Sequence, residues 1–216
     1  MNLINRLFAY AHELKLRLRE FRRARSHHNG KVHVMIDLET LGNRPGCKIL
    51  SIGAVAFSPQ GLGREFYVLV ERSSQNGIGL REDPETIKWW SEQNEAARAA
   101  VFGSQAAVPV RTALNHLTDF LTAVSFTDEV SDRREVCVWG NGAGFDQPIL
   151  AAVFRADGIP KLPWKFWNER CYRTLKNTAH GVPYSPPKIA HHALEDAKAQ
   201  AAHLVRILNR SEHGWE

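Results

Sequence analysis

From residue 32 onward, apolar residues alternate with other residues, which is the pattern of a strand with one face in the core. The alternating positions are Val32, Val34, Ile36 and Leu38. A loop rich in glycine leads to a second apolar run at 49–57, and a turn at 59–61 leads to a third at 64–70. Three strands joined by short turns predict an antiparallel meander.

Segments with helical signals follow the meander. The pair Asp83-Pro84 is typical of a helix start, and the helix carries Trp89 and Trp90. Since adjacent helical positions cannot face the same way, we expect one tryptophan in the core. Further helices are expected at 110–123, 147–156 and 193–208, with a strand at 135–139. This order predicts an α/β fold, with the meander and parallel strands in one mixed sheet flanked by helices.

Residues 1–31 form a separate basic arm and linker, and residues 32–210 form the domain. The arm holds eight Lys or Arg against Glu13 and Glu20, a net charge of +6, so the other 185 residues carry 20 basic and 21 acidic groups, a net charge of −1. Residues 2–24 have apolar positions at helical spacing. This amphipathic helix packs on the body or a partner, guides nucleic acid, or lies on a membrane surface.

The composition narrows the location of the protein. No apolar run approaches the roughly 20 residues needed to span a bilayer, and no convincing secretory signal is present, so we expect no membrane partner. Cys47, Cys137 and Cys171 are odd in number and far apart. They form no zinc motif, which indicates reduced residues in a cytoplasmic protein and leaves a catalytic thiol as a weaker alternative.

The first candidates for chemistry are Asp37 and Glu39, two residues apart near the end of a strand. Side chains at this spacing point to the same face, so the two carboxylates project together. Carboxylates held close repel, and a cation between them keeps both ionised. Alone, such a pair also fits an exposed strand edge.

Asp146 follows a strand and a loop that contains three glycines, which allow close approach of a ligand to the backbone. By itself Asp146 fits better a residue that caps the helix beginning near residue 147, a role compatible with binding a ligand. His191 and Asp196 open the last helix, about one turn apart, so both can reach one cleft. A lone histidine would also fit a packing or surface role.

Taken together, these residues resemble the DEDDh family of 3′–5′ exonucleases, of ribonuclease H-like fold. Residues 35–42 (MIDLETLG), 142–146 (GAGFD) and 191–197 (HHALEDA) are similar to its three motifs. The order and spacing agree over about 32–208. Residues 86–90 (TIKWW), 139–142 (WGNG) and 166–175 (FWNERCYRTL) are similar to the group of the phage T4-type exonuclease A and a mycobacterial exoribonuclease. One departure is Gly142, where better-known members have asparagine.

The resemblance implies a phosphodiester hydrolase that uses two Mg²⁺ or Mn²⁺ ions about 3.5–4 Å apart. The implied metal ligands are Asp37, which bridges both ions, Glu39, Asp146 and Asp196. His191 would accept a proton from the attacking water. The implied contacts to the terminal nucleotide are the backbone at Thr40 and Leu41, a wedge made by the Leu41 side chain, and Asn141, Phe145 and Trp89. A core role for Phe145 fits equally well.

Substrate and assembly stay open at this stage. The phage-like resemblance favours single-stranded DNA over RNA, and some similar enzymes are homodimers. Two other classes of function are weighed: a nucleic-acid-binding module on an inactive nuclease fold, and a structure-selective endonuclease of ribonuclease H-like fold. The complete set of four carboxylates and one histidine argues against the first.

Overall fold

The computed structural model describes residues 31–102, 106–127, 130–211 and 214–215. The predicted amphipathic helix at 2–24 and the linker after it lie outside the described residues. The division of the chain at residue 31 and the partner of the arm therefore stay predictions.

Five strands form one mixed sheet in the order β3-β2-β1-β6-β7. These are β1 (Lys31–Thr40), β2 (Ile49–Ser58), β3 (Gly61–Leu69), β6 (Glu135–Gly140) and β7 (Glu169–Cys171). The first three form the predicted antiparallel meander, β6 runs parallel to β1, and β7 runs parallel to β6. The predicted fold class is confirmed. The sequence did not predict β7, because three partly exposed residues give no alternating pattern.

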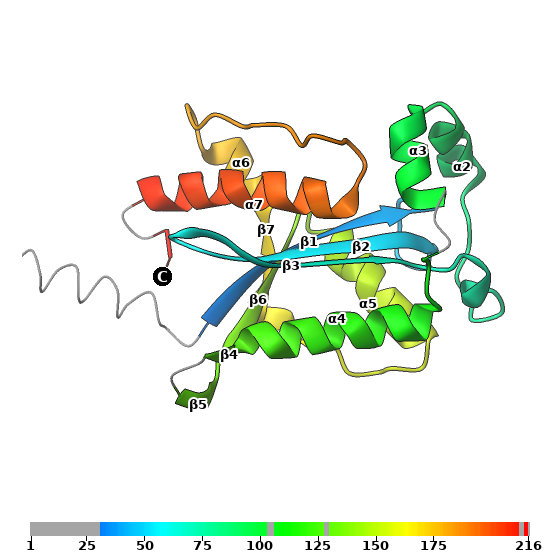
Figure 1. Ribbon diagram of the computed structural model, residues 1–216, viewed down its shortest axis with the longest axis horizontal. Coiled ribbons are helices and arrows are strands. Elements are labelled where there is room, and N and C mark those ends of the chain that lie inside the picture. Colours follow the sequence, from blue (N-terminus) through cyan, green and yellow to red (C-terminus); the bar gives the residue numbers. More distant parts are fainter. Residues whose placement is uncertain (1–30, 103–105, 128–129, 212–213, 216) are drawn as a thin grey trace, which may run out of the picture.

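Helices cover both faces of the sheet (Figure 1). On one face lie α4 (Val110–Ser125) and α5 (Asp146–Ala156), and on the other lie α6 (Tyr172–Thr178) and α7 (Ala193–Arg210). Strand β1 serves both layers: Val34 and Ile36 belong to the core that includes residues of α4 and α5, whereas Met35 belongs to the core with α7. The next residues of β1, Asp37 to Thr40, therefore end the strand between two packed layers.

Two short helices lie near the end of β1 (Figure 1), α2 (Pro84–Ser91) and α3 (Glu95–Phe102). Asp83 caps α2 by accepting a hydrogen bond of 2.9 Å from the backbone N–H of Glu85. Trp90 is buried, and its indole Nε1 donates to the Thr40 carbonyl, whereas Trp89 is 40% exposed. The prediction that only one tryptophan enters the core is confirmed.

The remaining elements are short. They are the 3₁₀ turns η1 (Ser73–Gln75) and η2 (Phe166–Asn168), and the two-stranded sheet of β4 (Phe126–Thr127) and β5 (Val130–Arg133). None of the helices in the described part of the chain is long and apolar enough to cross a membrane. The structure contains one chain, so a homodimer stays a prediction. Cytoplasmic location also stays a prediction.

Candidate active site

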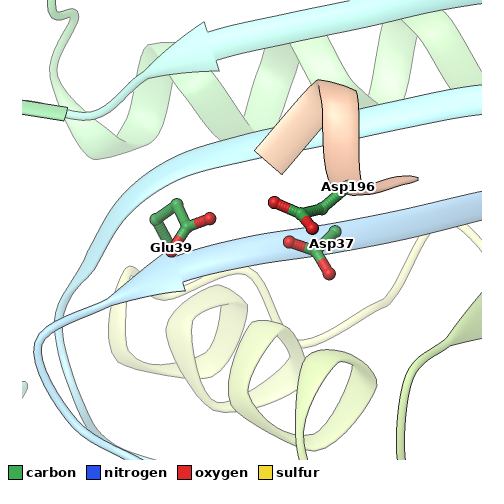
Figure 2. A group of neighbouring side chains, drawn as sticks. All are labelled: Asp37, Glu39 and Asp196. Atoms are coloured by element: carbon green, nitrogen blue, oxygen red, sulfur yellow. The ribbon is translucent and has the colours of Figure 1, made fainter. Parts of the chain in front are cut away.

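Three carboxylates converge at the end of β1. Asp37 and Glu39 project from the same face of this strand, and Asp196 comes from the first turn of α7. One oxygen of each lies within 4.8 Å of the other two. Figure 2 shows the three carboxylates gathered above the strand. We call these residues the acidic cluster.

A glycine on β2 allows this approach. Gly53 pairs with Asp37 across the meander. A β-carbon at Gly53 would lie 2.2 Å from the carbonyl carbon of Ala193 and 2.2 Å from the amide nitrogen of Leu194. The start of α7 therefore lies directly on the β2 backbone, and this contact brings Asp196 over Asp37. The role of Gly53 could not be predicted from the sequence, because a glycine inside a strand gives no sign of what packs on it.

The cluster is electrostatically strained without a cation. Burial raises the pKa of Asp37 well above its ordinary value, and the negative charges of Asp146, Glu39 and Asp196 raise it further. Burial, followed by the charges of Asp196 and Asp146, raises the pKa of Glu39 to about 8. The pKa of Asp196 is also raised, mainly by burial. Positive charge placed among these groups would stabilise their ionised forms.

Asp146 lies beside the cluster but outside the group of three. It is the first residue of α5, and Phe145 occupies the N-cap without a side-chain hydrogen bond, so Asp146 does not occupy the capping position. Its Oδ2 accepts a hydrogen bond of 2.7 Å from the backbone N–H of Asn141, and burial raises its pKa to about 6. Its Oδ1 is buried and has no hydrogen-bond partner among the described residues.

A cleft of about 630 Å³ opens over the acidic cluster. His191 lines this cleft with a positive φ of 60°. Its ring meets the ring of Trp89 edge-on, with the centroids 4.9 Å apart. A non-glycine residue in this backbone region is uncommon and is concentrated at functional sites.

The next residue, His192, has a structural position at the start of α7. His192 is the N-cap of α7, where its Nδ1 accepts from the backbone N–H of Glu195 at 3.5 Å. Its ring stacks on Tyr67, with centroids 4.4 Å apart. Its backbone N–H donates to Asp196 Oδ2 at 3.2 Å. The adjacent histidines thus separate into one that faces the cleft and one that orders the helix start.

Four of the five candidate substrate-binding residues line the cleft: Thr40, Trp89, Asn141 and Phe145. Phe145 also packs against the core, so its place is compatible with both of its predicted roles, contact with a nucleotide and packing in the core. Leu41 is the fifth candidate. Its side chain is 1% exposed inside a small apolar cluster, its N–H donates to the Lys48 carbonyl, and its carbonyl accepts from Asp83. Leu41 is therefore buried beside the cleft and does not line it, and the predicted wedge and backbone contact to a nucleotide stay predictions.

Two further residues of the cleft were not predicted from the sequence. Gln200, one turn after Asp196 on α7, donates from Nε2 to Asp37 Oδ1 at 2.7 Å. Its spacing of four from Asp196 was a usable signal. Arg173 is the one Lys or Arg among the described residues that line the cleft. Its guanidinium lies beside Gly142, which has a φ of +136° that few other residues adopt.

The donors of this site fit a divalent metal ion. Three carboxylates lie within reach of one ion, and a fourth, that of Asp146, has a buried oxygen with no hydrogen-bond partner in the described part of the chain. Hard oxygen ligands suit Mg²⁺, Mn²⁺ or Ca²⁺. Bound positive charge would also relieve the repulsion that raises the pKa values of Asp37 and Glu39.

Comparison with known proteins gives the family. The model of the 3′–5′ exoribonuclease Rv2179c-like domain matches residues 32–208. This chain belongs to that family. It is a 3′–5′ exonuclease domain, as the three motifs predicted. The exodeoxyribonuclease of Enterobacteria phage T4 is 26% identical over 161 residues, which are 65% of this chain and 68% of the relative.

Solved structures agree on the fold of this Rv2179c-like domain. The nuclease domain of 3′hExo, a DEDDh family member bound to rAMP, has a TM-score of 0.54 at 14% identity, over 83% of this chain and 92% of that chain. E. coli exonuclease I in complex with a dT13 oligonucleotide has a TM-score of 0.57 at 14% identity, over 83% and 41%. The predicted ribonuclease H-like fold and DEDDh resemblance are confirmed.

Proposed function

We propose that this exonuclease releases nucleotides from the 3′ end of single-stranded nucleic acid with the help of two divalent ions, Mg²⁺ or Mn²⁺. The observation that carries this proposal is the acidic cluster, in which oxygens of Asp37, Glu39 and Asp196 lie within 4.8 Å of one another. Asp146, with its unpartnered buried oxygen, completes the proposed metal ligands.

The chain's own residues then have distinct roles. Divalent cations at such a site supply positive charge to the phosphate and make a water molecule more acidic. His191 accepts the proton of the attacking water, and its position against Trp89 supports this role by holding the ring at the cleft. Gln200 orients Asp37 through its hydrogen bond.

The substrate contacts follow from the cleft. Trp89 is 40% exposed there and offers a face for the base of the terminal nucleotide. Asn141, Phe145 and Thr40 line the same cleft. Arg173 supplies positive charge for a phosphate, since guanidinium groups pair well with phosphate oxygens.

DNA is the first candidate substrate, and the exodeoxyribonuclease of phage T4 supports it. RNA is the second candidate, which the exoribonuclease description of the family supports. Discrimination depends on a contact to the 2′-OH. The same four carboxylates and His191 would serve either substrate.

The test compares matched DNA and RNA oligonucleotides labelled at the 5′ end, with and without Mg²⁺. We expect a ladder of shortening products and free mononucleotides with metal, none with a chelator, and none with the Asp196→Asn variant. A labelled circular single strand should stay intact. Cleavage of the circle would instead favour an endonuclease, and binding without any cleavage would favour a non-catalytic module.

A further inference from the structure

The two most exposed large apolar side chains of the described residues are neighbours. Phe166 is 74% exposed and Trp167 is 56% exposed, and both lie on the 3₁₀ turn η2 just before β7. Their rings meet edge-on, with centroids 4.9 Å apart. Large aromatic groups left this exposed on a soluble domain mark a contact surface.

The residues beneath the pair are firmly held. Asn168 is 2% exposed and its side-chain amide donates to Glu135 at 3.0 Å. Trp164 is buried and its Nε1 donates to Glu169 at 3.0 Å. Arg170 donates to the carbonyl of Trp167 at 2.8 Å. The turn that presents the aromatic rings is therefore anchored at both ends.

Cations accompany the rings. Lys165 Nζ lies 5.3 Å from the centre of a Trp167 ring and also pairs with Glu135, and the Arg170 guanidinium donates to the Trp167 carbonyl. Residues 165–173 hold three basic residues (Lys165, Arg170 and Arg173) and one acidic residue (Glu169), in a domain that is otherwise nearly neutral. Aromatic faces interleaved with cations are the means by which proteins bind single strands without sequence preference.

A short stretch of chain joins the pair to the cleft. Strand β7 is the edge of the sheet, and Arg173, which lines the cleft, comes two residues after it. Arg173 comes six positions after Trp167, so their Cα atoms lie at most roughly 20 Å apart. A single strand that leaves the cleft past Arg173 can reach the aromatic pair within a few nucleotides.

We propose that Phe166 and Trp167, with Lys165 and Arg170, form a β7 surface that stacks bases of the substrate on the 5′ side of the nucleotide being removed. This inference rests on the proposed exonuclease function. The β7 surface increases affinity for longer strands and does not take part in hydrolysis.

The test is the dependence of KM on substrate length. The Phe166→Ala/Trp167→Ala variant should raise KM for a dodecanucleotide by roughly five-fold or more, the factor expected for loss of one stacked base. Its kcat and its KM for a dinucleotide should match the wild type. Phe126→Ala, on β4 and 50% exposed, is the matched control and should change neither value.

A second series locates the contact. In binding assays with the Asp196→Asn protein, dodecanucleotides that lack one base at successive positions from the 3′ end are compared. Affinity should fall at one or two internal positions, and this dependence should vanish when Phe166 and Trp167 are also replaced.

The outcomes separate the two proposals. If the wild type hydrolyses neither the dodecanucleotide nor the dinucleotide, the proposed function fails. If it hydrolyses both substrates and the double variant leaves the length dependence unchanged, the inference about the β7 surface is overturned. A wild-type dimer that becomes a monomer in the double variant, seen by sedimentation, would also overturn it, because the rings would then face a second copy.

Discussion

Gly53 of β2 lies so close to Ala193, the first residue of α7, that a β-carbon at position 53 would come within 2.2 Å of the Ala193 carbonyl carbon. The atoms involved belong to the backbone, so the helix start must move to make room. We predict that Gly53→Ala lowers kcat at least ten-fold, since it displaces Asp196 from Asp37, and lowers stability by about 1–3 kcal/mol.

Gly63→Ala is the control for this substitution. A β-carbon at Gly63 on β3 would meet the nearest atom, the Ala56 carbonyl oxygen, at 3.4 Å, which is ordinary contact. The measurements are kcat on a short oligonucleotide and the midpoint of thermal unfolding. A Gly53→Ala protein as active and as stable as Gly63→Ala would show that the contact does not position α7.

Gln200 offers a second prediction. Its hydrogen bond lowers the pKa of Asp37 against the effect of burial. Without the donor, the pKa of Asp37 should rise further, so the acid limb of the kcat/KM profile should move to higher pH. Affinity for Mn²⁺ should fall by roughly ten-fold or more, as for other partners of metal ligands.

The variant is Gln200→Leu, measured by pH profiles and by titration with Mn²⁺. Lys198→Met is the control on the same helix, because Lys198 pairs with Glu65 and Glu195 and not with the acidic cluster. If the two variants have the same acid limb, Gln200 has only a packing role.

The adjacent histidines should behave differently. His191→Ala should lower kcat by roughly 10²- to 10⁴-fold, the usual contribution of a general base, with Mn²⁺ binding largely kept. His192→Ala should keep most activity and lose about 0.5–2 kcal/mol of stability, because it removes the N-cap of α7. Steady-state kinetics and urea unfolding measure the two effects. A crippled His192→Ala enzyme beside a mildly affected His191→Ala enzyme would reverse the assignment.

Glu39 makes the stability of the metal-free protein depend on pH. Its pKa is about 8 in the folded protein against an ordinary value of 4.5. Between these values the folded state binds a proton that the unfolded state has released, so the free energy of unfolding falls as the pH rises through this window. Glu39→Gln carries no charge and should lack this contribution.

Urea unfolding in the presence of a chelator tests this prediction. Near pH 8, Glu39→Gln should be more stable than the wild type by at least about 1 kcal/mol, since each pKa unit corresponds to about 1.4 kcal/mol. Near pH 4.5 the two proteins should be alike. A difference that stays constant with pH would show that Glu39 titrates normally.

The parts of this fold that follow from local patterns were predicted from the sequence. Alternation gave the meander, and the pair Asp83-Pro84 gave the start of α2. The convergence of Asp37, Glu39 and Asp196 was expected from the motifs. In the structure, one carboxylate oxygen of each lies within 4.8 Å of the other two.

The features that could not be predicted from the sequence depend on contacts between distant segments. Leu41 was predicted from its motif alone, and nothing in that motif showed that its side chain packs with Trp90, 49 residues later, or that its backbone groups bond to Lys48 and Asp83. The role of Gly53 depends on its contact with α7, about 140 residues away, and so leaves no local sequence signal. A local sequence pattern predicts whether a side chain faces the core or the solvent. It does not predict which residues of distant segments that side chain contacts.

The most direct measurement is a calorimetric titration of the metal-free protein with Mn²⁺ near pH 8, beside the Asp37→Asn/Asp196→Asn variant. Wild-type protein should take up two ions in a saturable manner and release protons, because Glu39 must ionise. The double variant should bind far more weakly. Absence of uptake by the wild type, or identical titrations of the two proteins, would contradict the account.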